Sequence, residues 1–250
     1  MKNFKYFIHL SIISLLFSCQ PCGPMQLAPC GGDIDMPTVD LIVMMDQSSS
    51  MNNAAQLLSD AVERAIDSAL QICPSDLRVT YLGVDGVAWP NTVFQTSHRD
   101  YLDSIHNATL VLSGDLPPMG YAPEQGANAV EDLSELFDWR KNACKAILYI
   151  SDEELDGVNP RNDLANETAT TQNAIDKALE NGVAVFTHLI DKRNLAPSIY
   201  QNYLDLAEKT GGIHLKTPDS SLSMQVYVDL IPIIICNACN GCTIQSLLDL

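Results

Sequence analysis

The feature that most constrains this chain is an apolar run that ends abruptly in an acid. Residues 41–45 (LIVMM) are followed by Asp46 and then by hydroxyls at Ser48 and Ser50. A short, continuous apolar run is typical of a strand buried on both faces, as in parallel sheets covered by helices. Ligands of open α/β sheets bind in loops outside the carboxyl ends of the strands. The run therefore predicts a buried parallel strand whose carboxyl end opens at a binding site.

Helix-like and strand-like segments alternate along the rest of the chain. In residues 53–72, small and apolar side chains recur with the spacing of a helix that buries one face. Further helices are expected at residues 102–106, 124–139, 169–180 and 197–209 and from residue 220 onward, and further strands at residues 78–84, 92–96, 146–150, 183–190 and 213–216. This alternation predicts an α/β fold with a doubly wound, mostly parallel six-stranded sheet flanked by helices. Residues 92–96 would be its one antiparallel edge strand, and Pro232 should end or kink the final helix.

The chain begins with the features of a bacterial export signal. Lys2 and Lys5 precede an apolar stretch over residues 6–17, which is too short for a membrane-spanning helix. Residues 16–19, Leu-Phe-Ser-Cys, resemble a bacterial lipobox, whose cysteine is acylated. The sequence therefore predicts a signal peptide over residues 1–18 and a lipoprotein anchored in the bacterial cell envelope through Cys19. Gln20 is not the acidic residue that retains many lipoproteins on the inner membrane, which favours the outer membrane.

Composition divides the rest of the chain into three regions, and net charge limits its partners. Residues 19–37, rich in Cys, Pro and Gly, predict a tether; residues 38–235 predict the main domain and residues 236–250 a Cys-rich tail. The chain carries 31 acidic and 14 basic residues, a net charge of −17 at pH 7, and loss of residues 1–18 would make it −19. Such acidity argues against nucleic acid as a partner. It suits either a soluble, self-repelling surface or one that concentrates divalent cations.

A cation site is predicted where several loops meet. Loops at the carboxyl ends of parallel strands share one face of the sheet, which brings together Asp46, the loop of residues 120–124 and Asp152, which follows the strand at 146–150. Mg²⁺ prefers oxygen ligands in near-octahedral geometry and keeps several waters, so a few carboxylates with serine hydroxyls suit it. Mn²⁺ and Ca²⁺ are compatible with the same donors.

These residues resemble a known family. Asp46-x-Ser48-x-Ser50 is similar to the first motif of the von Willebrand factor type A (vWA) domain, whose metal-ion-dependent adhesion site (MIDAS) combines DxSxS with a threonine and an aspartate from two further loops. Residues 147–152 (ILYISD) resemble the third motif, and residues 206–212 (LAEKTGG) resemble the sequence before the last strand. The resemblance covers about residues 39–235. It implies a module that binds a protein ligand offering an acidic side chain to the metal.

The middle motif departs from the common pattern. Residues 120–126 (GYAPEQG) contain no threonine and resemble the PE loop in the A-like domains of integrin β chains, where a glutamate contributes to the site. The resemblance therefore implies Glu124 as a ligand. An adjacent second metal site would need acids where this chain has Asn53 and Ala54, so one metal is expected.

Other residues favour binding rather than catalysis. Ser48 and Ser50 lie in no G-x-S-x-G nucleophile elbow, and the five histidines show no HExxH spacing, so we expect no enzyme. Asp85 and Trp89 lie in the loop after the strand at 78–84, where a partner would dock. The alternative for Trp89 is packing beneath its own loop.

Eight cysteines in an exported chain predict disulfides before metal binding. The candidates besides Cys19 are Cys22, Cys30, Cys73, Cys144, Cys236, Cys239 and Cys242. In the vWA arrangement the last helix returns to the face where the first strand starts, so the resemblance implies that Cys22 and Cys30 lie near the C-terminal trio, and it allows a bridge between Cys73 and Cys144. Two alternatives to ligand binding remain: a structural envelope lipoprotein whose metal only stabilises the loops, and a redox or metal protein using the C-terminal CxxCxxC.

Overall fold

The computed structural model describes residues 36–84, 89–106, 110–113, 125–155, 164–192 and 197–240. The chain divides into two compact units, Met1–Gly32 and Asp33–Leu250, and every described residue belongs to the second. The sequence predictions for the signal peptide, Cys19, Cys22 and Cys30 therefore lie outside the described residues. No helix that these residues form is both long and apolar enough to cross a membrane.

The described residues form one five-stranded sheet in which all strands are parallel, in the order β2-β1-β3-β4-β5. The strands are β1 (Thr38–Asp46), β2 (Asp76–Val84), β3 (Cys144–Ser151), β4 (Val183–Asp191) and β5 (His214–Pro218). β1 pairs with β2 on one side and with β3 on the other, and eight of its nine residues are buried. The predicted α/β fold with a largely parallel sheet and a buried first strand is confirmed.

The predicted sixth strand is wrong for the described residues. Residues 92–96 form bends and irregular backbone instead of an antiparallel strand, and this segment reaches the sheet through the bond from the Gly83 backbone N–H to the Thr96 carbonyl at 2.9 Å. The Thr92 hydroxyl explains the departure, because it donates to the Trp89 carbonyl at 3.0 Å and accepts from the Phe94 backbone N–H at 3.2 Å. Such local side-chain bonds compete with a strand ladder for the same backbone groups.

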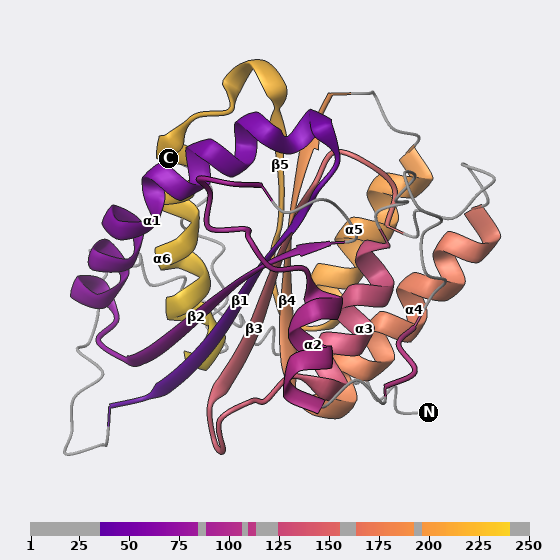
Figure 1. Ribbon diagram of the computed structural model, residues 1–250, viewed down its shortest axis with the longest axis horizontal. Coiled ribbons are helices and arrows are strands. Elements are labelled where there is room, and N and C mark those ends of the chain that lie inside the picture. The colour runs from indigo at the N-terminus through magenta and orange to yellow at the C-terminus, as the bar shows by residue number, and fades with distance from the viewer. Residues whose placement is uncertain are drawn as a thin grey trace, which may run out of the picture. The chain divides into compact units, whose positions relative to one another are not determined.

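Helices cover both faces of the sheet (Figure 1). They are α1 (Asn52–Ile72), α2 (His98–His106), α3 (Gly126–Leu136), α4 (Leu164–Asn181), α5 (Pro197–Lys209) and α6 (Met224–Asn240), with short 3₁₀ turns η1 (Ser49–Met51) and η2 (Asp219–Ser221). α1 and α6 lie on one face, and α2 to α5 lie on the other (Figure 1). α6 does not end at Pro232 but continues to Asn240.

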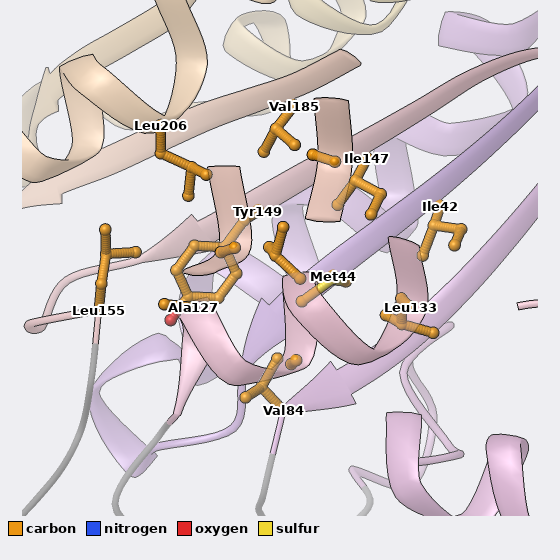
Figure 2. Close-up of a cluster of buried hydrophobic side chains, with 14 of the residues drawn as sticks. Ile42, Met44, Val84, Ala127, Leu133, Ile147, Tyr149, Leu155, Val185 and Leu206 are labelled. Carbon is orange, nitrogen blue, oxygen red and sulfur yellow. The ribbon is translucent and has the colours of Figure 1, made fainter. Parts of the chain in front are cut away.

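Two apolar clusters, one on each face, follow from the alternation of side chains along β1. Ile42 and Met44 point toward α3 and pack with residues such as Tyr149 and Val185 (Figure 2), whereas Leu41, Val43 and Met45 point toward α1 and α6. α1 meets the sheet with a row of small buried residues, which lets the helix approach closely: Ala54, Ala61, Ala65 and Ala69.

The residue types of the TGG segment, residues 210–212, are explained by close packing of the chain against β4. Thr210 accepts a hydrogen bond from the Val185 backbone N–H at 3.0 Å, and Gly211 has a φ of +85°, which favours glycine. A Cβ on Gly212 would lie 1.9 Å from the Val185 carbonyl oxygen, so no other residue fits there without moving the backbone. Here the motif serves the turn between α5 and β5.

A disulfide joins the helices of the α1/α6 face. Cys73, at the end of α1, bonds to Cys236 in α6, with Cα atoms 5.5 Å apart and a sequence separation of 163. The suggested Cys73–Cys144 bridge is therefore wrong, because α1 packs beside α6 whereas Cys144 begins β3. Cys236 is the first cysteine of the C-terminal CxxCxxC motif, so this disulfide already uses one of its three thiols. The side chain of Cys239 and the whole of Cys242 lie outside the described residues.

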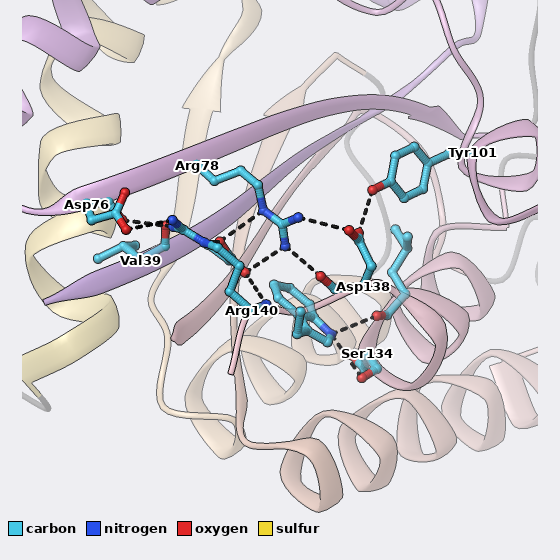
Figure 3. A network of polar contacts seen from close by, with 10 residues as sticks. Val39, Asp76, Arg78, Tyr101, Ser134, Asp138 and Arg140 are labelled. Atoms are coloured by element: carbon cyan, nitrogen blue, oxygen red, sulfur yellow. Dashed lines mark hydrogen bonds and ion pairs between the residues drawn. The ribbon is translucent and has the colours of Figure 1, made fainter. Parts of the chain in front are cut away.

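A polar network fastens the amino ends of β1 and β2 (Figure 3). Asp40 is buried and accepts two bonds from the Arg78 guanidinium, at 3.0 and 2.7 Å. It also accepts from the Arg140 backbone N–H at 2.8 Å and from Arg140 Nε at 2.6 Å. Burial alone would raise the pKa of Asp40, but these bonds from Arg78 and Arg140 hold it below its usual value.

Asp40→Asn should be strongly destabilising. The change leaves two guanidinium groups facing a neutral amide, and we expect a loss of about 2–4 kcal/mol in the free energy of unfolding, measured by urea denaturation near neutral pH. Asp138→Asn is the matched control, because Asp138 pairs with the same Arg78 but its side chain is 51% exposed. That variant should lose less than about 1 kcal/mol. Equal losses in the two variants would contradict the importance given to Asp40.

Candidate functional site

The site lies where the central strands β1 and β3 end. The two strands are adjacent and in register, with Met45 beside Ile150, so Asp46 and Ser151 leave the sheet side by side. The loops that follow carry Ser48 and Ser50 on one side and Asp152 on the other. Two segments that are far apart in the sequence therefore meet, as the sequence predicted.

Asp46 is fully buried and shapes the first loop. Its Oδ1 accepts a hydrogen bond from the Ser48 backbone N–H at 2.6 Å, a local turn typical of aspartate. Its Oδ2 accepts from the Ser151 hydroxyl at 2.8 Å, which ties the ends of β1 and β3 together. The chain then enters η1, where Met51 is buried and its N–H bonds to the Ser48 carbonyl at 3.0 Å. The carboxylate thus fixes where the serine hydroxyls stand.

The hydroxyls connect the first loop to the second. Ser48 Oγ lies 2.8 Å from Ser50 Oγ, and the Ser50 hydroxyl donates to Asp152 Oδ1 at 3.0 Å. Both serines are half-buried, whereas Asp46 and Asp152 are buried. A continuous series of polar contacts therefore runs from Asp46 to Asp152, with the hydroxyls on its more exposed side.

The electrostatics of the site favour a cation. Burial raises the pKa of Asp46 to about 6, against bonds from Ser48 and Ser151 that lower it, and the nearby carboxylates of Asp152 and Glu153 raise it further. A buried, ionised acid beside another acid is costly unless a positive charge approaches. The donors are two carboxylates and two hydroxyls, all hard oxygen ligands, and this set fits Mg²⁺. Within the part of the chain that the structure describes, no three His, Cys, Asp or Glu side chains gather at metal-binding spacing.

A positively charged side chain that the sequence analysis missed lies at the same place. Lys192 directly follows β4, and its Nζ lies 3.6 Å from Asp152 Oδ2 and donates to the Ser50 backbone carbonyl. The signal was present, because a lysine follows a predicted strand at its carboxyl end. What the sequence did not provide was the order of the strands, which puts β4 beside β3.

Glu124 lies outside the described residues, but the segment that follows it, from Gln125 onward, is described. Gln125 is buried, and the Ala127 backbone N–H bonds to the Leu155 carbonyl at 2.8 Å. A Cβ on Gly126 would lie 2.3 Å from the Tyr149 ring, so a larger residue there would require the ring to move. The structure therefore brings the segment after Glu124 to the loop that contains Asp152.

Of the two predicted docking residues, Trp89 is the one that the structure describes. Trp89 is half-buried and packs against the apolar cluster on the α1/α6 face, and its carbonyl accepts the Thr92 hydroxyl. Asp85 lies outside the described residues. The arrangement of Trp89 corresponds to the alternative in which it packs beneath its own loop.

Comparison with known proteins gives only distant matches. No family model matches the sequence, and no curated protein matches it. Among solved structures, the chain is similar to the VWA domain of SpRpn10 at 14% identity, covering 77% of this chain and 94% of that one with a TM-score of 0.45. It is also similar to the pilus adhesin SpaC from Lactobacillus rhamnosus GG (14% identity, 82% and 31% coverage, TM-score 0.49) and to mussel byssus PTMP1 with a zinc-occupied MIDAS motif (12%, 80% and 46%, 0.43). The chain thus spans less than half of SpaC and of PTMP1.

Asp46→Asn should remove a pH-dependent loss of stability from the metal-free chain. The pKa of Asp46 is about 6 in the folded chain and 3.8 ordinarily. Its contribution to stability is therefore fully present below the ordinary value and is lost as the pH rises through 6. The neutral amide escapes this loss but gives up one of the two acceptor oxygens of the carboxylate. In urea unfolding in EDTA, the stability of the variant relative to the intact chain should therefore rise by roughly 2–3 kcal/mol between about pH 4 and pH 7.5, on top of a constant cost of the lost acceptor. A stability difference that does not change with pH would contradict this assignment.

Proposed function

We propose that this chain is a vWA-type domain that binds a protein ligand through one divalent cation. The observation that carries the proposal is the contact between Ser50 and Asp152, 3.0 Å apart and 102 residues separated in sequence. It joins the first and third MIDAS-like motifs, which the sequence identified independently. The order of the motifs and their meeting in space support the same site.

Asp46, Ser48, Ser50 and Asp152 would hold the cation, together with Glu124 as the resemblance implies. Mg²⁺ is the preferred ion, and Mn²⁺ or Ca²⁺ would suit the same oxygen donors. The bound ion would supply a coordination position for the carboxylate of a partner protein. The half-buried serines support this role, because they leave the cation reachable from solvent.

A binding role, not an enzymatic one, agrees with the surroundings of the serines. The two hydroxyls contact each other and Asp152, so they belong to a cluster of oxygen donors that suits a metal ion. The described histidines contact the Gly83 and Leu136 carbonyls, Thr217 and Thr187. A serine nucleophile is commonly activated by a histidine base.

The proposal extends to export and to attachment to the bacterial envelope through an acylated Cys19, with the outer membrane favoured. It rests on the basic and apolar pattern of residues 1–18 and on the lipobox-like residues 16–19. The acidic partner would then be another envelope or surface protein.

Isothermal titration with Mg²⁺ and Mn²⁺ tests the metal site. The intact chain should bind one ion, and Asp46→Asn should weaken the affinity at least about tenfold, since it removes a carboxylate ligand. Asp132→Asn is the matched control, because Asp132 is also buried with a pKa raised to about 6 but lies on α3, where it accepts the Ser113 backbone N–H. Equal weakening in both variants would mean that buried charge in general, and not this site, governs the affinity.

Capture of a partner from envelope extract tests ligand binding. The partner should be retained in Mg²⁺ or Mn²⁺, released by EDTA and not bound by Asp46→Ala, while circular dichroism shows an intact fold in each case. Retention that is indifferent to EDTA would instead favour a structural protein whose metal only stabilises the loops.

A further inference from the structure

The proposed cation site contains a positive charge that belongs to the chain itself. The Lys192 ammonium lies 3.6 Å from Asp152 Oδ2 and donates a hydrogen bond to the Ser50 carbonyl, and its side chain is 15% exposed. Asp152 is fully buried. The lysine thus contacts two of the residues that would surround a divalent ion.

A second acid lies on the other side of the same ammonium. Asp219, the first residue of η2, places Oδ1 3.7 Å from Lys192 Nζ, and its side chain is 52% exposed. Among the contacts that the described residues show, Asp219 is linked to the site through Lys192. The ammonium therefore stands between a buried acid of the site and an exposed acid beside it.

We propose that Lys192 is a tethered competitor of the divalent cation. In the metal-free chain its ammonium offsets the charge of Asp152 and holds the Ser50 loop in place. A divalent ion and an ammonium in contact with the same buried carboxylate repel each other strongly, so the ion binds only when Lys192 moves away, toward Asp219. The site then fills only where the cation concentration is high enough to displace the lysine.

This inference rests on the proposed function, and a pair of lysine variants separates the two. Lys192→Gln should raise the affinity for Mg²⁺ and Mn²⁺ about tenfold or more in isothermal titration at fixed ionic strength. Lys216→Gln is the matched control, because it removes the same positive charge from a different place. Lys216 lies on the neighbouring β5 and pairs with Asp191 at 2.9 Å. It should change the affinity less than about twofold.

The outcomes are distinct. If the intact chain binds the ion and Lys192→Gln binds it equally well or more weakly, the competitor role is wrong and the metal site stands. If neither chain binds the ion, the metal site and the competitor role are both wrong. If both lysine variants gain equally, the effect is one of net charge, and Lys192 has no special part.

Asp219→Asn gives a second test on a residue whose side chain is 52% exposed. Without this acceptor the displaced ammonium is less stable, so cation affinity should fall about two- to fivefold in the intact chain. In the Lys192→Gln background the same change should have a smaller effect, because no ammonium has to be received. An equal fall in both backgrounds would show that Asp219 acts on the ion only through its charge and would overturn the proposed movement.

Discussion

The structure depends on how one central strand satisfies two buried acids. Asp40 and Asp46 lie near opposite ends of β1, and their even spacing places both on the face that packs against α3, with Ile42 and Met44 between them. A carboxylate in such a position is tolerated only when hydrogen bonds or opposite charges compensate it. At each end of the strand, the acid therefore accepts hydrogen bonds from residues that are distant in sequence.

The two acids are compensated in different ways, and the difference separates fold from function. Asp40 faces two arginines and a backbone N–H, so its pKa is lowered and its charge stabilises the folded chain. Asp46 faces one N–H and one hydroxyl and lies near other acids, so burial raises its pKa. The first end is complete by itself, whereas in the proposed function the second would gain free energy when a cation binds. Burial of Asp46 opposes ionisation of its carboxyl at neutral pH, and a bound cation would offset that cost.

The local pattern carried enough information to predict the strand and the residues at its end. The run at 41–45, the acids after β1 and β3 and the serine spacing depend on neighbours in sequence or on the general geometry of parallel sheets, and the structure brings Asp46 and Asp152 together as expected. The sequence did not predict what depends on the order of elements in space. Lys192 reaches Asp152 only because β4 lies beside β3, and Cys73 finds Cys236 only because α1 packs beside α6. The alternation of side chains at 92–96 predicted a strand, but it gave no sign of the local hydrogen bonds of the Thr92 hydroxyl that replace it.

The overall charge of the chain bears on the proposed role of Lys192. With a net charge of −17, the protein attracts every cation in its surroundings, so attraction alone discriminates poorly between them. Hydroxyl ligands and buried carboxylates select a small, hard divalent ion by geometry. If Lys192 competes with the cation as proposed, its ammonium beside Asp152 would add a threshold, because an ion must offer the site more than one positive charge to replace it. Monovalent ions gain nothing in that exchange, so in the proposed site selectivity follows from charge as well as from ligand geometry.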